Sequence, residues 1–184
     1  MSDLHLLVVH GTSRRGNKSI KAAEFVTQTA KKNKNLSVKL VTPHDFKTPG
    51  DGRNKEDKSK DYGVLVKKAD GFIFVIPEYN HAFPGSIKRL LDTEFDSYNR
   101  KPVLLVGVSS GPWGGVRAIQ SILPVVRSLK MIAIKDDIYF TNINEFFDGN
   151  GEPIDRSARE RVQKSIKELL WFAKTLKKGR ESQL

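Results

Sequence analysis

The chain has 184 residues, of which 38% are hydrophobic and 29% charged, as in folded globular domains rather than disordered chains. It contains no cysteine, which excludes disulfide bonds, thiolate metal sites and cysteine nucleophiles. The net charge of +11 raises the question of nucleic-acid binding, but the basic residues are scattered and no aromatic stacking platform accompanies them. We therefore expect solvated basic faces, phosphate-bearing small ligands and no nucleic-acid partner.

The apolar segments set the expected domain organisation and compartment. The longest of them have the length of a strand, so we expect no transmembrane segment and no membrane partner. An apolar strand follows Asp3 directly, without the basic region that opens a signal peptide. A chain of this length folds most simply as one domain spanning residues 1–184, and we expect it in the cytoplasm.

In the first third of the chain, apolar patterns predict two strands joined by a helix. Leu4–His10 is apolar enough for a strand that is covered on both faces. The helix that follows has one apolar face, formed by Ala22, Ala23, Val26 and Ala30. Leu36–Thr42 is the second predicted strand. Residues 47–61 lack apolar periodicity, which predicts a mobile surface loop.

The middle of the chain continues the alternation of helices and strands. A short helix is predicted around Tyr62–Ala69, followed by a buried third strand at Phe72–Ile76. Val103–Val108 is the fourth predicted strand. The next helix has an apolar side, formed by Val116, Ile119, Leu123 and Val126. Pro124 lies inside that helix, where we expect it to cause a kink or a shift of register.

The C-terminal part contains the fifth predicted strand, Met131–Ile134, and an irregular connection over residues 135–154. The final helix has the clearest apolar periodicity, at Val162, Ile166, Leu169, Leu170, Ala173 and Leu176. We expect residues 178–184 to form a frayed tail. Five strands alternating with helices predict an α/β fold, a three-layer sandwich around a parallel sheet, and the flavodoxin-like strand order 2-1-3-4-5 is the leading choice.

In that order the loops after strands 1 and 3 open a crevice between two neighbouring strands. The first of them, GTSRRGNKS from Gly11 to Ser19, combines hydroxyls, guanidinium groups and backbone N–H groups at a helix N-terminus, which suits a phosphate dianion. It is not a Walker A motif, because Asn17 separates Gly16 from Lys18. No G-x-G-x-x-G follows a strand, so a Rossmann dinucleotide site has no support.

The second loop lies in the stretch PEYNHAFPGSIK, residues 77–88. Pro77 ends the third strand, since proline cannot donate to a sheet ladder, and Pro84 suits the first position of a short helix. The residues between are more polar and aromatic than a minimal turn needs; they include Glu78, Tyr79, Asn80 and His81. By itself this stretch fits a ligand-binding loop and an ordinary connection with a turn-forming asparagine about equally.

The third loop, Ser109–Gly115, follows the fourth strand and matches the G-x-S-x-G elbow of serine hydrolases, with Ser109 as the nucleophile. In that fold the histidine follows the serine, whereas all four histidines of this chain precede Ser109. We therefore favour glycines that let backbone N–H groups approach a flat ligand edge, with Trp113 as either a wall of the site or a core residue. The isolated histidines give no metal-ligand spacing.

Together the segments GTSRRGNKS, PEYNHAFPGSIKRLLD and SSGPWGGVRA resemble the NADPH-dependent FMN reductase family, which includes quinone and azo-dye reductases of flavodoxin-like fold. The second segment is the most specific, since the family pattern reads close to P-E-Y-N-x-x-x-P-G-x-L-K-x-x-x-D. The resemblance extends from the first strand through the fourth helix, and it is weaker over residues 47–61 and after Lys135.

The resemblance implies FMN as cofactor and NADPH or NADH as co-substrate. It implies that the phosphate is held by Thr12, Arg14, Asn17 and Ser19, although relatives often carry Ser or Arg at the position of Asn17. The isoalloxazine ring would be lined by Pro77, Glu78, Tyr79, Asn80 and His81. The pyrimidine edge would meet Ser110, Gly111, Gly114 and Gly115. The family also implies a homodimer or a homotetramer.

The implied function is hydride transfer from NAD(P)H to N5 of bound FMN, and then to a quinone, azo compound, free flavin or similar small-molecule acceptor, with ping-pong kinetics. No catalytic side chain is required for this transfer, so we expect positioning residues only. Two alternatives stay open. A non-catalytic flavodoxin-like electron carrier is disfavoured by the charge of +11, and the serine hydrolase by the order of its residues.

Overall fold

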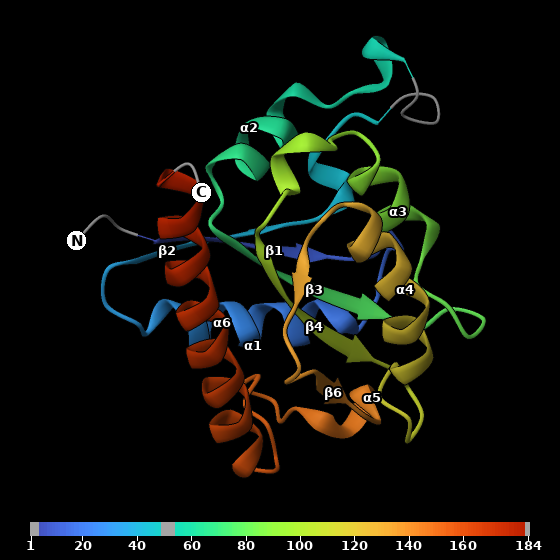
Figure 1. Ribbon diagram of the computed structural model, residues 1–184. Coiled ribbons are helices and arrows are strands. Elements are labelled where there is room, and N and C mark those ends of the chain that lie inside the picture. Colours follow the sequence, from blue (N-terminus) through green and yellow to red (C-terminus); the bar gives the residue numbers. More distant parts are fainter. Residues whose placement is uncertain (1–3, 49–53, 183–184) are drawn as a thin grey trace.

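The computed structural model describes residues 4–48 and 54–182, and it places a parallel sheet between two layers of helices (Figure 1). The strands are β1 Leu4–His10, β2 Leu36–Val41, β3 Gly71–Pro77, β4 Pro102–Val108, β5 Ile132–Ala133 and β6 Ile138–Phe140. The helices are α1 Ser19–Lys31, α2 Lys60–Lys68, α3 Gly85–Leu91, α4 Val116–Ser128, α5 Ile143–Phe146 and α6 Ser157–Glu181. Short 3-10 turns occur at Pro43–Asp45, Lys55–Asp57 and Asp96–Tyr98.

The strand order β2-β1-β3-β4-β5 confirms the flavodoxin-like topology predicted from the sequence. The last position of the sheet differs from the prediction, because two short strands share it. β5 pairs with the start of β4 and β6 pairs with its end, both in parallel. The charged residues Lys135, Asp136 and Asp137 separate the two strands, while Ile138 and Phe140 are buried. The connection predicted as irregular over 135–154 therefore contains β6 and α5.

Alternate residues of the central strands pack against opposite helical layers. Leu7 and Val9 of β1 join the core beneath α2, α3 and α4, whereas Leu6 and Val8 join the core beneath α1 and α6. Because both faces are covered, β3 and β4 are buried at every position, which explains their unbroken apolar sequences.

Some predicted boundaries change in the structure. Pro84 is the N-cap of α3 rather than its first residue, and α4 continues past Pro124. Of the loop predicted over residues 47–61, positions 49–53 lie outside the described residues, and the remainder includes the turn Lys55–Asp57 and the start of α2. The prediction of a frayed tail from residue 178 is wrong as far as Glu181, because α6 continues to that residue.

The end of α6 is held by one carboxylate. Asp70, whose side chain is only 8% exposed, accepts hydrogen bonds from the backbone N–H of His5, from Lys177 and from Arg180. Arg180 also donates to the carbonyl of Arg100, just before β4, at 2.8 Å. These contacts bind the last turn of α6 to the N-terminal edge of the sheet, which is why the helix does not fray there.

The Asp70 cluster gives a stability prediction. Asp70→Asn should lower the free energy of unfolding by about 2–4 kcal/mol, below the full cost of breaking a buried pair because Lys177 and Arg180 are partly exposed. Urea denaturation followed by circular dichroism measures the change. The matched control is Asp92→Asn, which removes the more exposed pair between Lys88 and Asp92 and should cost about 0.5 kcal/mol. Equal effects of the two substitutions would contradict the assigned role.

Candidate cofactor site

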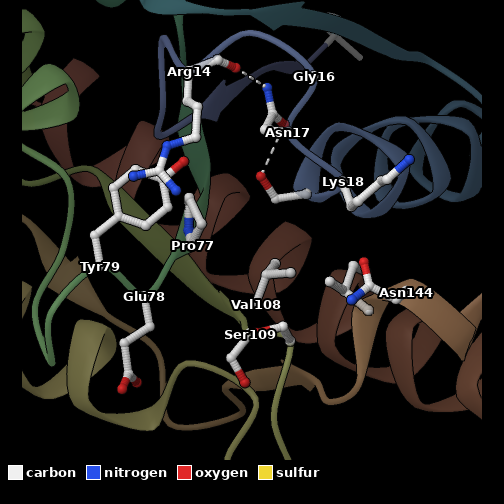
Figure 2. Close-up of a pocket in the computed structure, with 13 residues that line it drawn as sticks. Arg14, Gly16, Asn17, Lys18, Pro77, Glu78, Tyr79, Val108, Ser109 and Asn144 are labelled. Atoms are coloured by element: carbon white, nitrogen blue, oxygen red, sulfur yellow. Dashed lines mark hydrogen bonds between the residues drawn. The ribbon is translucent and has the colours of Figure 1, made fainter.

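A pocket of about 260 Å³ lies at the carboxyl ends of β1, β3 and β4. This is the crevice expected at the switch point of the sheet, because α1 and α3 pack on opposite faces after neighbouring strands. Figure 2 shows the side chains around it. The lining residues come from three loops and from α5: Arg14, Gly16, Asn17, Lys18, Ser19, Pro77, Glu78, Tyr79, Val108, Ser109, Ser110, Ile143 and Asn144.

The first loop is shaped by the side chain of Asn17 (Figure 2). Its amide donates to the carbonyl of Arg14 at 2.7 Å, and its oxygen accepts from the hydroxyl of Ser19 and from the backbone N–H of Ile20. Asn17 thus caps the first turn of α1 and closes the loop on itself. Within the described residues, no acceptor is found for the N–H groups of Lys18 and Ser19. These groups, with the positive end of the helix, leave the loop ready to bind an anion.

Arg14 and Tyr79 connect the first loop to the second. The Arg14 guanidinium carbon lies 3.9 Å from the centroid of the Tyr79 ring, a cation–π contact that Figure 2 shows. The Tyr79 hydroxyl in turn lies 2.9 Å from the hydroxyl of buried Thr12, which also accepts from the N–H of Arg14. Thr12 therefore lies behind the pocket wall and holds both partners of the stacked pair in place.

Two further contacts hold the first loop against its neighbours, and the sequence analysis missed both. Ser86 of α3 donates to the carbonyl of Gly11 and accepts from the N–H of Ser13. His44, in the turn after β2, contacts the carbonyl of Ser13 through Nε2. The only sequence signal was the position of Ser86 within the predicted helix start; His44 is distant in sequence and gave none.

The second loop is a tight hairpin. The backbones of Tyr79 and Ala82 exchange two hydrogen bonds, and the two residues between them, Asn80 and His81, have φ angles of 49° and 65°. Positive φ at both central positions is typical of a type I′ turn, in which asparagine is favoured. The side chains of Asn80 and His81 are exposed at the hairpin tip and do not line the pocket.

Glu78 points away from the first loop and toward α4 (Figure 2). Its carboxylate accepts from the backbone N–H of Arg117 at 3.2 Å and pairs with the Arg117 guanidinium at 3.4 Å. A carboxylate at the N-terminus of a helix is stabilised by the helix dipole. Glu78 therefore fixes the second loop to α4, and only part of its side chain reaches the pocket.

The third loop folds back onto the end of β4. A Cβ atom on Gly107 would lie 2.5 Å from the carbonyl oxygen of Gly114, and Gly114 and Gly115 both have positive φ. Gly114 and Gly115 thus allow close packing, whereas a Cβ atom on Gly111 would meet open space. All three glycines lie outside the pocket lining. Trp113 is 64% exposed, so it is not a core residue.

Ser109 does not have the surroundings of a hydrolase nucleophile. Its hydroxyl donates to the carbonyl of Gly111 at 2.8 Å, and its N–H donates to Phe140. Among residues 4–48 and 54–182, no hydrogen bond connects Ser109 to a histidine, and no group of acidic and histidine residues is arranged to hold a metal ion. The G-x-S-x-G pattern here reflects the close packing of the loop.

The pocket brings together a little over half of the predicted cofactor residues: Arg14, Asn17, Ser19, Pro77, Glu78, Tyr79 and Ser110. The others are not among its lining residues: Thr12, Asn80, His81, Gly111, Gly114 and Gly115. Lining residues that the sequence analysis did not select are Gly16, Lys18, Val108, Ser109, Ile143 and Asn144. Ile143 and Asn144 belong to α5, a helix too short to give a periodic signal.

A buried histidine lies beneath the first loop. His10, at the end of β1, is 1% exposed, and its Nε2 lies 2.8 Å from the Ser19 hydroxyl. Because that hydroxyl can donate to Asn17, His10 is the donor to Ser19 when its Nε2 carries the proton. Burial lowers the pKa of His10 to about 4, so its ring is neutral at physiological pH. A neutral His10 ring supports the Asn17–Ser19 arrangement without placing a positive charge in the protein interior.

The lowered pKa of His10 predicts a pH-dependent loss of stability. In the unfolded chain His10 takes up a proton as the pH falls below 6.5, whereas in the folded protein its pKa is about 4. The free energy of unfolding should therefore decrease as the pH falls from 6.5 to about 4. The full contribution is about 3 kcal/mol. His10→Gln should remove this part of the pH slope in urea denaturation, while His81→Gln, at the exposed hairpin tip, should keep it. An unchanged slope in His10→Gln would refute the assignment.

Among the described residues, no helix is both long and apolar enough to cross a lipid bilayer.

Comparison with known proteins identifies relatives of this chain. A stretch of 112 residues is 28% identical to an NAD(P)H-dependent FMN reductase of Pseudomonas aeruginosa, covering 58% of this chain and 60% of that protein. The chain is also 25% identical to a quinone reductase of Pseudomonas putida, over 82% of this chain and 84% of that one.

The fold comparison agrees. The structure of FerB, a flavoenzyme NAD(P)H:(acceptor) oxidoreductase from Paracoccus denitrificans, superposes with a TM-score of 0.77 at 18% identity, covering 94% of this chain and 98% of FerB. The model of the NADPH-dependent FMN reductase family matches residues 4–145, a segment that contains all three loops of the pocket. The chain therefore belongs to the NADPH-dependent FMN reductase family.

Proposed function

We propose that this protein is an NAD(P)H-dependent reductase that binds FMN in the pocket and reduces a quinone, an azo compound, a free flavin or a similar small molecule. One observation carries the proposal. An anion cradle at the start of α1 and an aromatic wall at Tyr79 line the same cavity, at the switch point of the sheet. A phosphate and a flat ring are the two parts of FMN that such a cavity would have to hold.

The first loop would hold the phosphate. Arg14 and Lys18 supply positive charge, and the N–H groups at the start of α1 supply donors. Ser19 is the predicted contact with the most indirect role, because its hydroxyl is engaged by His10 and Asn17. Thr12 and Asn17 would act by shaping the loop, since their polar side-chain atoms already have partners within it.

The second and third loops would hold the ring. Pro77 and Tyr79 provide flat apolar surfaces, and Ser110 provides a polar group from the third loop. The volume of about 260 Å³ lies just below the usual range for ligand cavities, roughly 300–1,000 Å³. We infer that Arg14 moves off the Tyr79 ring toward the phosphate when FMN binds, which would widen the cavity. Asn80, His81, Gly111, Gly114 and Gly115 would contribute at the rim or through backbone groups.

When bound, FMN would supply the redox chemistry, taking a hydride from NAD(P)H and passing it to the acceptor in turn, hence ping-pong kinetics. The protein would bind and orient it. The pair Glu78–Arg117 would keep the second loop against α4, so that the Pro77–Tyr79 wall stays fixed relative to the third loop. No titratable side chain of the pocket is needed to move a proton at the hydride-transfer step, so positioning is the main contribution of the chain.

The alternatives are weaker. An electron carrier of this fold would bind FMN without oxidising NAD(P)H, and the charge of +11 is unlike that of the acidic carriers. A serine hydrolase is disfavoured because, among the described residues, the Ser109 hydroxyl bonds to the carbonyl of Gly111 and to no histidine. A homodimer or homotetramer and a cytoplasmic location stay predictions from the sequence.

The proposed activity predicts a yellow protein. After reconstitution with FMN, the purified protein should show the flavin absorption bands, and anaerobic addition of NADPH or NADH should bleach them. Adding a quinone should then restore the colour. An FMN complex that NAD(P)H does not bleach would identify an electron carrier, and failure to retain FMN at all would remove the flavoenzyme proposal.

The phosphate assignment has a matched pair of variants. Arg14→Ala should weaken FMN binding by about 1.5–3 kcal/mol, the usual range for a hydrogen bond to a charged group. Arg15→Ala removes the neighbouring, exposed guanidinium, which does not line the pocket, and should change the affinity little. Fluorescence titration of FMN gives both dissociation constants. If both variants bind FMN like the wild type, the first loop is not the phosphate site.

A further inference from the structure

The outer face of α6 carries a row of lysines around one tryptophan. Lys164, Lys167, Trp171, Lys174 and Lys178 are all exposed, and the spacing between successive members is three, four, three and four residues. On an α-helix this spacing places side chains in a single stripe. The stripe, which we call the α6 stripe, extends over about 21 Å at 1.5 Å per residue. It lies opposite the buried face of the helix, formed by Val162, Ile166, Leu169 and Ala173.

The charges of the α6 stripe are not neutralised by the protein. Among the described residues, none of its four lysines has a carboxylate within ion-pair distance. The ion pairs that α6 does form involve residues outside the stripe: Arg159, Arg161, Lys177 and Arg180. Three exposed carboxylates of α6 lie one helical turn from lysines of the stripe: Glu160, Glu168 and Glu181. Within the described chain, none of them is within ion-pair distance of those lysines, so the stripe keeps an excess of positive charge.

Trp171 stands in the middle of that surface with 59% of its area exposed. Its ring meets Phe172 edge to face at 5.0 Å, but no other aromatic contact of Trp171 is found within the described chain. Fold stability does not explain a large apolar ring that is left in water between lysines. An indole flanked by lysines suits a boundary that is apolar on one side and anionic on the other.

A basic groove continues the surface at the end of the helix. It has a volume of about 320 Å³ and lies between α6 and the start of β1. Four lysines and one carboxylate line it: Lys34, Lys174, Lys177, Lys178 and Glu181. This end of the molecule is the N-terminal edge of the sheet, since Asp70 ties α6 to it (Figure 1). The cofactor pocket opens at the opposite edge, so contact with the groove and the adjoining half of the stripe would leave the pocket accessible.

We propose that the α6 stripe binds the surface of a lipid bilayer that contains anionic headgroups, with Trp171 inserted at the headgroup level. Charge complementarity and the central indole carry the choice of partner. Lysines are point charges that respond to the negative surface potential of such a bilayer. Single-stranded nucleic acid would need a series of stacking rings, and the stripe has one. This proposal replaces the expectation of no membrane partner, which rested on the lack of a spanning segment, because binding at a bilayer surface needs no such segment.

The test uses the FMN-loaded 184-residue chain with Trp113→Phe, so that Trp171 is the one tryptophan left in it. The probes are vesicles of phosphatidylcholine with and without phosphatidylserine, at roughly 0.1 M salt, where screening is moderate. The protein should co-sediment with the anionic vesicles only, and the Trp171 emission should shift to the blue. Trp171→Ala in the native Trp113 background should bind several-fold more weakly. Sedimentation with both kinds of vesicle, or an unshifted emission, would overturn the proposal.

Charge variants distinguish the effect of lysines in the stripe from the effect of the overall net charge. Lys167→Glu with Lys174→Glu should weaken vesicle binding by more than about tenfold, since each lysine near such a surface counts for roughly a fivefold change. The control, Lys60→Glu with Lys135→Glu, alters the net charge equally at two exposed lysines outside α6, and it should weaken binding by less than about threefold. Equal losses would mean that only net charge matters and would overturn the proposal.

Two further measurements serve as controls: one tests whether the variants stay folded, and the other tests a competing partner. The circular dichroism and the FMN absorption of each charge variant should match those of the unaltered protein, because both altered lysines of the stripe are exposed and outside the pocket. A single-stranded RNA homopolymer is the competing probe. If the protein binds this RNA and the stripe variant loses that binding while the vesicles stay unbound, the partner is a nucleic acid and the bilayer proposal fails.

Discussion

The parallel pairing of β1 with β3 is the constraint on which the site depends. His10 is in register with Val75, and the N–H of Gly11 donates to the carbonyl of Val75 at 2.7 Å. The chain can leave β1 this close to β3 because Gly11 has no side chain; a Cβ atom there would lie 3.1 Å from that carbonyl oxygen. The pairing brings Thr12 within reach of Tyr79. A shift of register by one residue would exchange the two faces of β1 and separate this contact.

Much of this arrangement could be predicted from the sequence. Strands covered on both faces leave unbroken apolar runs, and β1, β3 and β4 each gave one. Parallel strands then place their following loops at one edge, so the polar residues of those loops were expected to meet. The crevice expected between these loops is present, and Arg14 and Tyr79 from the two loops both line it. Helix periodicity likewise identified the buried face of α6.

Other features depend on tertiary contacts that no local pattern records. Asn17 was expected at a phosphate, yet its amide closes its own loop. Glu78 was expected at a flavin ring, yet it pairs mainly with Arg117 across the loops. β6 is only three residues long, too short for a periodicity to emerge, and it forms because β4 offers a free edge beside it. Arg180 looked like part of a charged tail, since nothing near it in the sequence indicates the buried carboxylate that holds it.

The division of the last sheet position between β5 and β6 also bears on how this protein avoids self-association through its sheet. A continuous strand there would present a long row of unpaired N–H and C=O groups, on which the strand of another molecule could assemble. Instead the edge consists of a two-residue piece and a three-residue piece, separated by Lys135, Asp136 and Asp137. Those charges would have to be desolvated by any strand that added along the full edge. An interruption that obscured a strand in the sequence thus makes this edge of the sheet a poor template for another strand, whereas β2 at the opposite edge is continuous over six residues.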